Sequence, residues 1–205
     1  LNTSFFGGGP SNTDDTIIYF RNIDTIDWIV RDSSTIRGRR DTVRKFRDPS
    51  AWYHIVAVFD STNTTAADRM KLYINGVQET AFDTETNPAQ NTDSVINSTS
   101  YTTYVGKGRD NGLLFDGYLA DVHFIDGAAL DATSFGETDA NGVWVPIEYA
   151  GTDATVDFVA GSEGSVIGNM TETPGGLAAA FDGDRDQTGG GSGTGTSLPS
   201  AAAQG

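Results

Sequence analysis

The stretches WYHIVAVFD, residues Trp52–Asp60, and RMKLYINGVQE, residues Arg69–Glu79, decide the fold class of this chain of 205 residues. In the first stretch the odd-numbered and the even-numbered residues are both mostly apolar, so both faces of an extended strand would be apolar. This pattern predicts a strand buried on both faces. In the second stretch apolar and polar residues alternate, which predicts a strand with one buried face. Asn75 and Gly76 favour the positive φ angles of a tight hairpin turn. Together these features predict an all-β fold, an antiparallel β-sandwich.

Patterns on either side of these stretches extend the predicted sandwich. We expect strands at 16–20 and 24–30, with the turn near Asn22, and an exposed, charged pair of strands at 35–39 and 42–46. A long polar surface loop is expected at 80–100, further strands at 103–108 and 117–127, a helical turn capped by Asp131, and at 141–146 a turn followed by a short strand. In 117–127 the alternation assigns Tyr118, Ala120, Val122 and Phe124 to the core. Trp28 and Trp52 are expected to be buried because they alternate with core positions.

Composition limits the classes of partner. The chain has 13 Lys and Arg against 28 Asp and Glu, a net charge of −15, which argues against nucleic acid and anionic membranes because both attract cationic surfaces. Basic residues crowd the segment from Arg31 to Arg47. We interpret them as solvated side chains on a strand pair; the alternative is a basic patch that meets an acidic neighbour or glycan. Without cysteine there is no disulfide or thiolate metal site, and no apolar stretch approaches the ~20 residues of a membrane span.

Three motifs carry a family resemblance. The opening Trp-Tyr-His of Trp52–His54, the ending Leu-Tyr-Ile-Asn-Gly of Leu72–Gly76 and the Gly-Tyr-Leu-Ala-Asp-Val of Gly117–Val122 resemble the laminin-G-like, or concanavalin-A-like, lectin and glucanase superfamily. The likeness spans roughly Ser4 to Pro146. It implies a concanavalin-A-like jelly roll. The longer stretches 48–77 and 115–146 resemble modules of tailed-phage virion proteins, particularly those of marine phages, which implies a place on the surface of the extracellular virion, with other virion proteins and host-surface carbohydrate as partners.

A change in composition divides the chain into two parts. We expect a laminin-G-like β-sandwich at 1–150, and at 151–205 an extended segment or the start of a truncated second module. Residues 188–205 are almost entirely Gly, Ser, Thr and Ala, and 179–187 resemble the opening of a discoidin-like module. Because the chain begins with Leu1, we expect it to be a piece of a longer protein.

Catalysis has little support in the sequence. The Glu-x-Asp-x-x-Glu spacing by which retaining glucanases of this superfamily place an acid and a nucleophile around the glycosidic bond does not occur. His54 and His123 are the only histidines, and we interpret both as packed strand residues rather than as parts of a metal or nucleophilic site. We therefore expect no enzymatic activity.

Candidate binding residues remain. Tyr101, Tyr104 and Trp144 are candidates for stacking on a sugar ring, since Tyr101 borders a polar loop and Trp144 follows a turn. Asp182, Asp184 and Asp186 form an Asp-x-Asp-x-Asp run that suits Ca²⁺, the one cofactor that the sequence suggests; a plain acidic turn is the alternative.

These observations favour a non-catalytic module of a phage fibre, tail or head appendage that binds host-surface glycan through its rim loops. A purely structural decoration or assembly module that contacts neighbouring virion subunits is the first alternative, and a polysaccharide hydrolase or lyase is the second. We expect a homo-oligomer, with a trimer as one form, although no heptad repeat indicates the number of chains.

Overall fold

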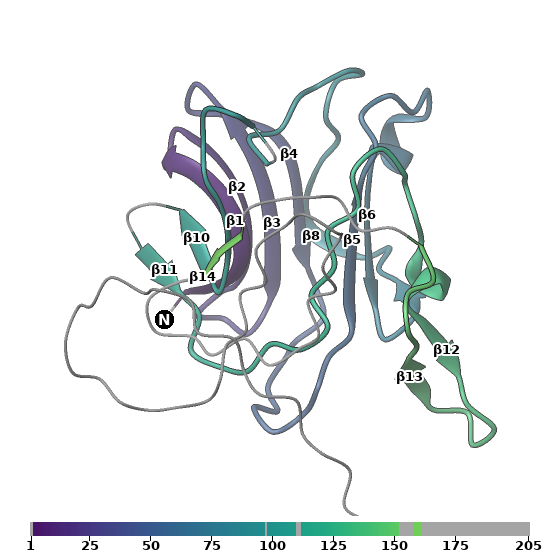
Figure 1. Cartoon of the computed structure of the whole chain (residues 1–205). Coiled ribbons are helices and arrows are strands. Elements are labelled where there is room, and N and C mark those ends of the chain that lie inside the picture. The colour runs from purple at the N-terminus through teal and green to yellow at the C-terminus, as the bar shows by residue number, and fades with distance from the viewer. Residues whose placement is uncertain (1, 97, 110–111, 152–157, 161–205) are drawn as a thin grey trace, which may run out of the picture.

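The computed structural model describes residues 2–96, 98–109, 112–151 and 158–160 and has the predicted all-β, sandwich architecture (Figure 1). Its large sheet has seven strands in the order β14-β9-β1-β2-β3-β4-β8. All pairs in this sheet are antiparallel except β14 with β9, which is parallel. The strands are β1 (Thr3–Ser11), β2 (Asp14–Phe20), β3 (Ile26–Asp32), β4 (Thr35–Thr42), β8 (Phe82–Thr86), β9 (Thr103–Val105) and β14 (Phe158–Ala160).

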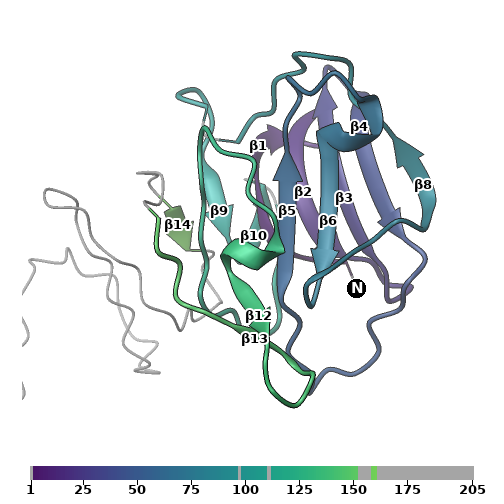
Figure 2. The same ribbon diagram turned by 90° about the vertical axis from the view of Figure 1, so that its right-hand side faces the viewer.

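The second layer is smaller. It is a three-stranded sheet of β5 (Ile55–Phe59), β6 (Met70–Ile74) and β7 (Val77–Gln78), and Figure 2 shows β5 and β6 in front of the large sheet. The predicted hairpin is confirmed, since Ile74 pairs with Val77 and both Asn75 and Gly76 have positive φ. The remaining elements are β10 (Lys107–Arg109) with β11 (Gly112–Leu114), β12 (Gly136–Thr138) with β13 (Trp144–Pro146), and the 3₁₀ turns η1 (Ala66–Arg69) and η2 (Ala132–Ser134). Asp131 caps η2, as predicted, by accepting from the backbone N–H of Thr133.

The main core lies between the two layers. Ile18, Trp28 and Val30 of the large sheet form one buried cluster with Leu72 and Ile74 of β6. Leu72 and Ile74 are fully buried because every second residue of β6 points inward, as the alternation predicted. Trp28 is 3% exposed, so its predicted burial is confirmed.

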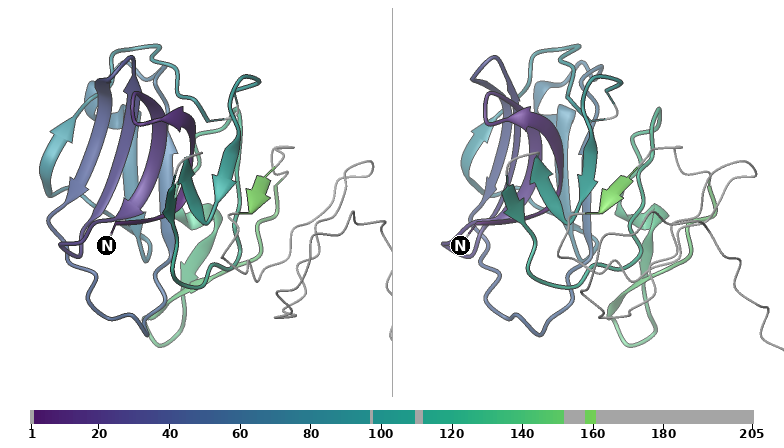
Figure 3. Two further views of the ribbon diagram at one scale, coloured as in Figure 1. Left: turned by 90° about the vertical axis from the view of Figure 1, so that its left-hand side faces the viewer. Right: turned by 60° about the vertical axis from the view of Figure 1, so that its left-hand side comes forward.

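The opposite face of the large sheet, seen in Figure 3, carries a row of buried ion pairs. The buried carboxylates belong to neighbouring strands: Asp15 on β2, Asp27 on β3 and Asp41 on β4. Arginines pair with them: Arg31 of β3 and Arg109 of β10 with Asp15, Arg39 of β4 with Asp27, and Arg21, which follows β2, with Asp41. Arg31 and Arg39 of the crowded basic segment are therefore paired with buried aspartates rather than simply solvated.

Three strand predictions need correction. The expected exposed pair at 35–39 and 42–46 is a single strand, β4, and its Arg40 is 1% exposed because its guanidinium donates to backbone carbonyls, including those of Met70 and Thr86. The predicted loop at 80–100 contains β8, which pairs with β4. The predicted strand at 117–127 is irregular, and Tyr118, expected in the core, is 72% exposed.

The central stretch also differs from its prediction. Its strand begins only at Ile55, and all five residues of β5 are partly rather than fully buried. Trp52 precedes the strand and is 66% exposed, so its predicted burial is wrong. Alternation assigns a face only within a strand that packs in a sheet, and Trp52 lies outside the assigned strand.

The end of the described chain joins the large sheet. Strand β14 lies beyond the domain boundary expected at 150 and pairs with β9. Among the described residues no helix has the length and apolar character needed to cross a membrane.

Candidate functional site

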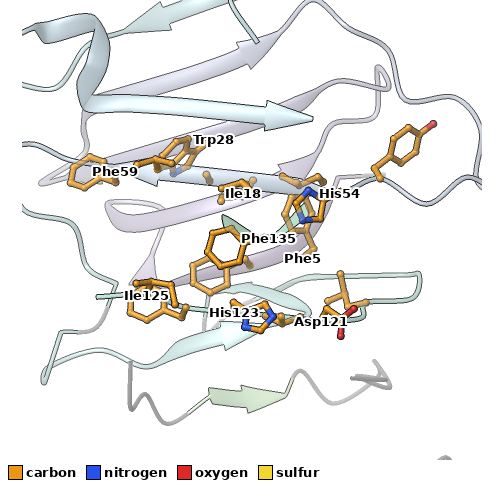
Figure 4. A pocket seen from close by; sticks show the side chains of 18 of the residues that line it. Phe5, Ile18, Trp28, His54, Phe59, Asp121, His123, Ile125 and Phe135 are labelled. Atoms are coloured by element: carbon orange, nitrogen blue, oxygen red, sulfur yellow. The ribbon is translucent and has the colours of Figure 1, made fainter. Parts of the chain in front are cut away.

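A cavity of about 1470 Å³ lies between the two layers. It exists because the second sheet has only three strands, whereas the large sheet has seven. Beyond β5 the cavity is therefore closed by the irregular segment Phe115–Leu130 instead of by a paired strand. Figure 4 shows the two walls: His54 and Phe59 at the ends of β5 on one side, and Asp121, His123 and Ile125 on the other. Typical ligand pockets measure roughly 300–1,000 Å³, so the space is large enough for a ligand.

Aromatic rings stand among the aliphatic and polar side chains that line the cavity. Phe5, Phe20 and Phe59 line it and are only partly buried, although they pack against the main core. Phe5 contacts Phe20 with ring centroids 5.5 Å apart, and Trp28 meets Phe59 edge to face at 6.4 Å. A tightly closed sandwich would bury these rings fully, so the aromatic walls are surface available to an apolar ligand.

One end of the cavity is polar and is held in place by the hairpin turn. The backbone N–H of His54 donates to the side-chain carbonyl of Asn75, and the backbone N–H of Asn75 donates to the carbonyl of His54, both at 2.8 Å. The indole N–H of Trp144 donates to Nδ1 of His54 at 3.1 Å. Trp144 in turn packs closely on Gly76, where a Cβ atom would lie 2.3 Å from its ring. The turn therefore positions both aromatic side chains.

The hydrogen bond fixes the protonation state of His54. Because Nδ1 accepts the indole proton, the imidazole is neutral, with its own proton on Nε2. Burial lowers the pKa of His54, the nearby Asp121 carboxylate partly opposes this, and His123 lowers it further. His54 is thus a neutral polar group at the cavity end, and both histidines lie outside regular strands, contrary to our prediction.

The same end opens to solvent between two exposed segments. The lining residues Asp48–Trp52 on one side and Asp116–Tyr118 on the other are exposed. We call the opening between these segments the mouth. Trp52 and Tyr118, 66% and 72% exposed, are large aromatic side chains of these segments, Asp48 and Asp116 are carboxylates of the same segments, and Asp121 also lines the cavity. Exposed aromatic rings next to hydrogen-bond acceptors can stack on a sugar and bind its hydroxyls.

The residues predicted to bind sugar are not gathered at this mouth. Tyr104 is 8% exposed and Lys107 lies 4.4 Å over its ring, which argues against a stacking role. Tyr101 is 39% exposed but does not line the cavity. Trp144 is half-buried and reaches the cavity only through His54. Sugar binding by Tyr101 or Trp144 stays a prediction.

The metal prediction falls on residues that the structure does not describe. Asp182, Asp184 and Asp186 lie outside the described residues, so calcium binding there stays a prediction. Within the described part of the chain no group of three or more His, Asp or Glu side chains is arranged to hold a metal ion.

Sequence reasoning missed Trp52 and Tyr118 as surface residues. Both were assigned to the core from alternation, and both lie in irregular backbone. The one local signal was their position next to turn-forming residues, Pro49–Ala51 before Trp52 and Gly117 before Tyr118. Nothing local indicates that the two segments meet at one opening.

Comparison with known proteins bears on this arrangement. Residues 2–133, more than half of the chain, match a protein family described as the concanavalin A-like lectin/glucanases superfamily. The match includes both sheets apart from β14, and every cavity-lining residue except Phe135. Neither the curated proteins nor the solved structures yield a match.

Proposed function

Because the chain belongs to the concanavalin A-like lectin/glucanase superfamily, we propose that it is a non-catalytic carbohydrate-binding module. The observation that carries this proposal is the pair of exposed aromatic residues, Trp52 and Tyr118, beside carboxylates at the mouth of the cavity. A pyranose stacks its apolar face on such rings, and its hydroxyls donate to carboxylate oxygens.

The residues at the mouth of the cavity favour a binding role over hydrolysis. A retaining glucanase needs two carboxyl groups on opposite sides of the glycosidic bond, and the sequence lacks the spacing that supplies them. The histidine that lines the mouth already uses Nδ1 to accept from Trp144, so that nitrogen is not free to act as a general base.

Within this proposal the module belongs to a phage virion and binds glycan on the host surface. The support is the likeness of residues 48–77 and 115–146 to phage virion modules. The mouth lies between these two stretches, since Trp52 comes from the first and Tyr118 from the second.

A glycan array tests the proposal. Wild-type protein, presented multivalently, is compared with Trp52→Ala, Tyr118→Ala and Val43→Ala, the last being an exposed apolar residue outside the cavity lining. Each aromatic truncation is expected to weaken binding about tenfold, since a stacking contact adds roughly 0.5–1.5 kcal/mol beyond the area it buries. Val43→Ala is expected to bind like the wild type.

Two results would count against the proposal. One is a wild-type protein that binds no glycan at high display density. The other is glycan binding that is retained by Trp52→Ala and Tyr118→Ala but lost in Tyr101→Ala or Trp144→Ala. That result would show that the binding site lies at the residues predicted from sequence. New reducing ends released from a bound polysaccharide would replace the binding role by a hydrolytic one.

A further inference from the structure

We propose that the cavity between the sheets takes an alkyl chain, so that the ligand of this module is an uncharged saccharide carrying an acyl or alkyl group. The sugar part of this inference rests on the proposed function, whereas the chain part rests on the cavity alone. The sugar would lie at the mouth beside Trp52 and Tyr118, and the chain would run inward along β5.

The first argument is the lining of the cavity. Phe5, Phe20 and Phe59 of the sheets, Phe115, which packs against Phe5 and Phe20, and Phe135 are all partly buried and offer ring carbon rather than hydrogen bonds. A buried water molecule needs two to four polar partners, and rings of this kind supply none. Hydrocarbon is therefore the better occupant beside these rings, while the lining also holds two buried polar atoms without a hydrogen-bond partner, Oγ1 of Thr16 and Nε1 of Trp28.

The second argument is the shape of the space. Its walls follow all five residues of β5, Ile55–Phe59, which span about 17 Å at the usual rise of a strand. Figure 4 shows Ile18, Trp28 and Phe5 along this length, with His54 and Asp121 at one end and Phe59 and Ile125 at the other. A space that follows β5 over this length fits an extended chain, with a polar head group at the end where His54 and Asp121 lie.

The third argument concerns the charge of that head group. Asp48, Asp116 and Asp121 lie at the mouth, and the described lining of the cavity contains no Lys or Arg. An anionic head, such as the carboxylate of a fatty acid or a phosphate, would face these aspartates without a cation to balance it. A neutral saccharide meets no such repulsion and can donate its hydroxyl hydrogens to the carboxylates.

The position of Phe115–Leu130 favours an alkyl chain over a strand of another protein as the occupant of the cavity. The far edge of β5 has no strand partner in the described sheet, and such an edge could pair with a strand of another molecule. However, Asp121, His123 and Ile125 lie across the cavity from that strand (Figure 4). A protein strand would have to displace this segment, whereas an alkyl chain enters without moving it.

Titration calorimetry with alkyl maltosides tests the inference. Hexyl, octyl and decyl maltoside are titrated below their critical micelle concentrations, with maltose as the probe without a chain and decanoate as the probe with an anionic head. We expect one molecule bound per protein chain and an affinity that rises about fourfold per methylene, the factor for transfer of a methylene out of water. Decanoate is expected to bind at least tenfold more weakly than decyl maltoside.

A cavity-filling variant ties the effect to this space. Ala57 of β5 lines the cavity, so Ala57→Phe is expected to abolish the dependence of affinity on chain length. Val43→Phe adds the same ring outside the cavity and is expected to behave like the wild type. Thermal unfolding of each variant shows whether it folds; if Ala57→Phe does not, the wild-type series still decides the question.

The outcomes separate the two proposals. If the affinity of the wild-type protein for alkyl maltosides does not change with chain length, the inference of an alkyl-chain site is overturned. Glycan binding on the array would then still support the proposed function. Affinity that rises with chain length but is equal for decanoate and decyl maltoside overturns the saccharide part. Dimers seen by light scattering, with no binding of any probe, would show that a second copy covers the space.

Discussion

Removal of the Asp27 carboxylate is the sharpest test of the ion-pair row on the outer face of the large sheet. Asp27 is fully buried, and its two oxygens accept from Nε and Nη2 of Arg39 at 3.0 and 2.7 Å. The hydroxyl of Tyr19 donates to the same carboxylate at 2.9 Å. Burial and the charge of Asp27 both raise the pKa of Tyr19, so Tyr19 remains a neutral donor. Asp27→Ala would leave the Arg39 guanidinium and a buried hydroxyl without this partner.

The expected loss follows from the burial of the pair. Breaking a buried ion pair by removing one partner costs about 3–5 kcal/mol, because the other charge stays desolvated. The Arg39 side chain is 20% exposed and keeps a carboxylate oxygen of Asp41 at 3.5 Å, which places Asp27→Ala near the lower limit, about 3 kcal/mol. For a domain of this size that corresponds to a fall of roughly 6–12 °C in Tm.

Urea denaturation measures this loss, and the chain offers a matched control. Asp32 and Arg37 also pair between β3 and β4, but their side chains are 55% and 43% exposed. Asp32→Ala is expected to leave the urea midpoint close to that of the wild type, with any difference disappearing in 1 M salt, because exposed pairs are screened. If Asp27→Ala destabilised the protein no more than Asp32→Ala, the buried pair would contribute no stability and this reasoning would be refuted.

Two further predictions concern the polar end of the cavity. Because its pKa is lowered, His54 is neutral in the folded protein, so its contribution to stability is complete above pH ~6.5 and is lost as the pH falls below that value. The unfolding free energy should therefore fall more between pH 7.5 and 5.5 in the wild type than in His54→Asn; equal losses would contradict this. Gly76→Ala should destabilise the protein more than Gly142→Ala in urea denaturation: both positions have positive φ, which costs an alanine about 1–2 kcal/mol, but only at Gly76 does the added methyl meet the ring of Trp144. Equal losses for the two glycine variants would show that the indole moves aside freely.

Sequence patterns predicted the structure correctly where it depends on residues that are close together in the sequence. The turn at Asn75 and Gly76 and the cap at Asp131 were predicted correctly because each needs only local backbone geometry and a nearby side chain. The same patterns failed at Trp52 and Tyr118, which alternate like core residues but lie outside the strands of the sheets. In the candidate site, therefore, the aromatic residue types were predictable but their exposure was not.

The sequence by itself determined the all-β class, the hairpin and the likeness to the superfamily, because alternation and turn chemistry are written in consecutive residues. Only the tertiary structure decided which charges pair and where the cavity lies. Arg109 meets Asp15 across 94 positions of the chain, and the indole of Trp144 meets His54 across 90. Such contacts depend on which segments become neighbours when the layers pack. The mouth and the cavity arise in the same way, from the mismatch between a sheet of seven strands and a sheet of three.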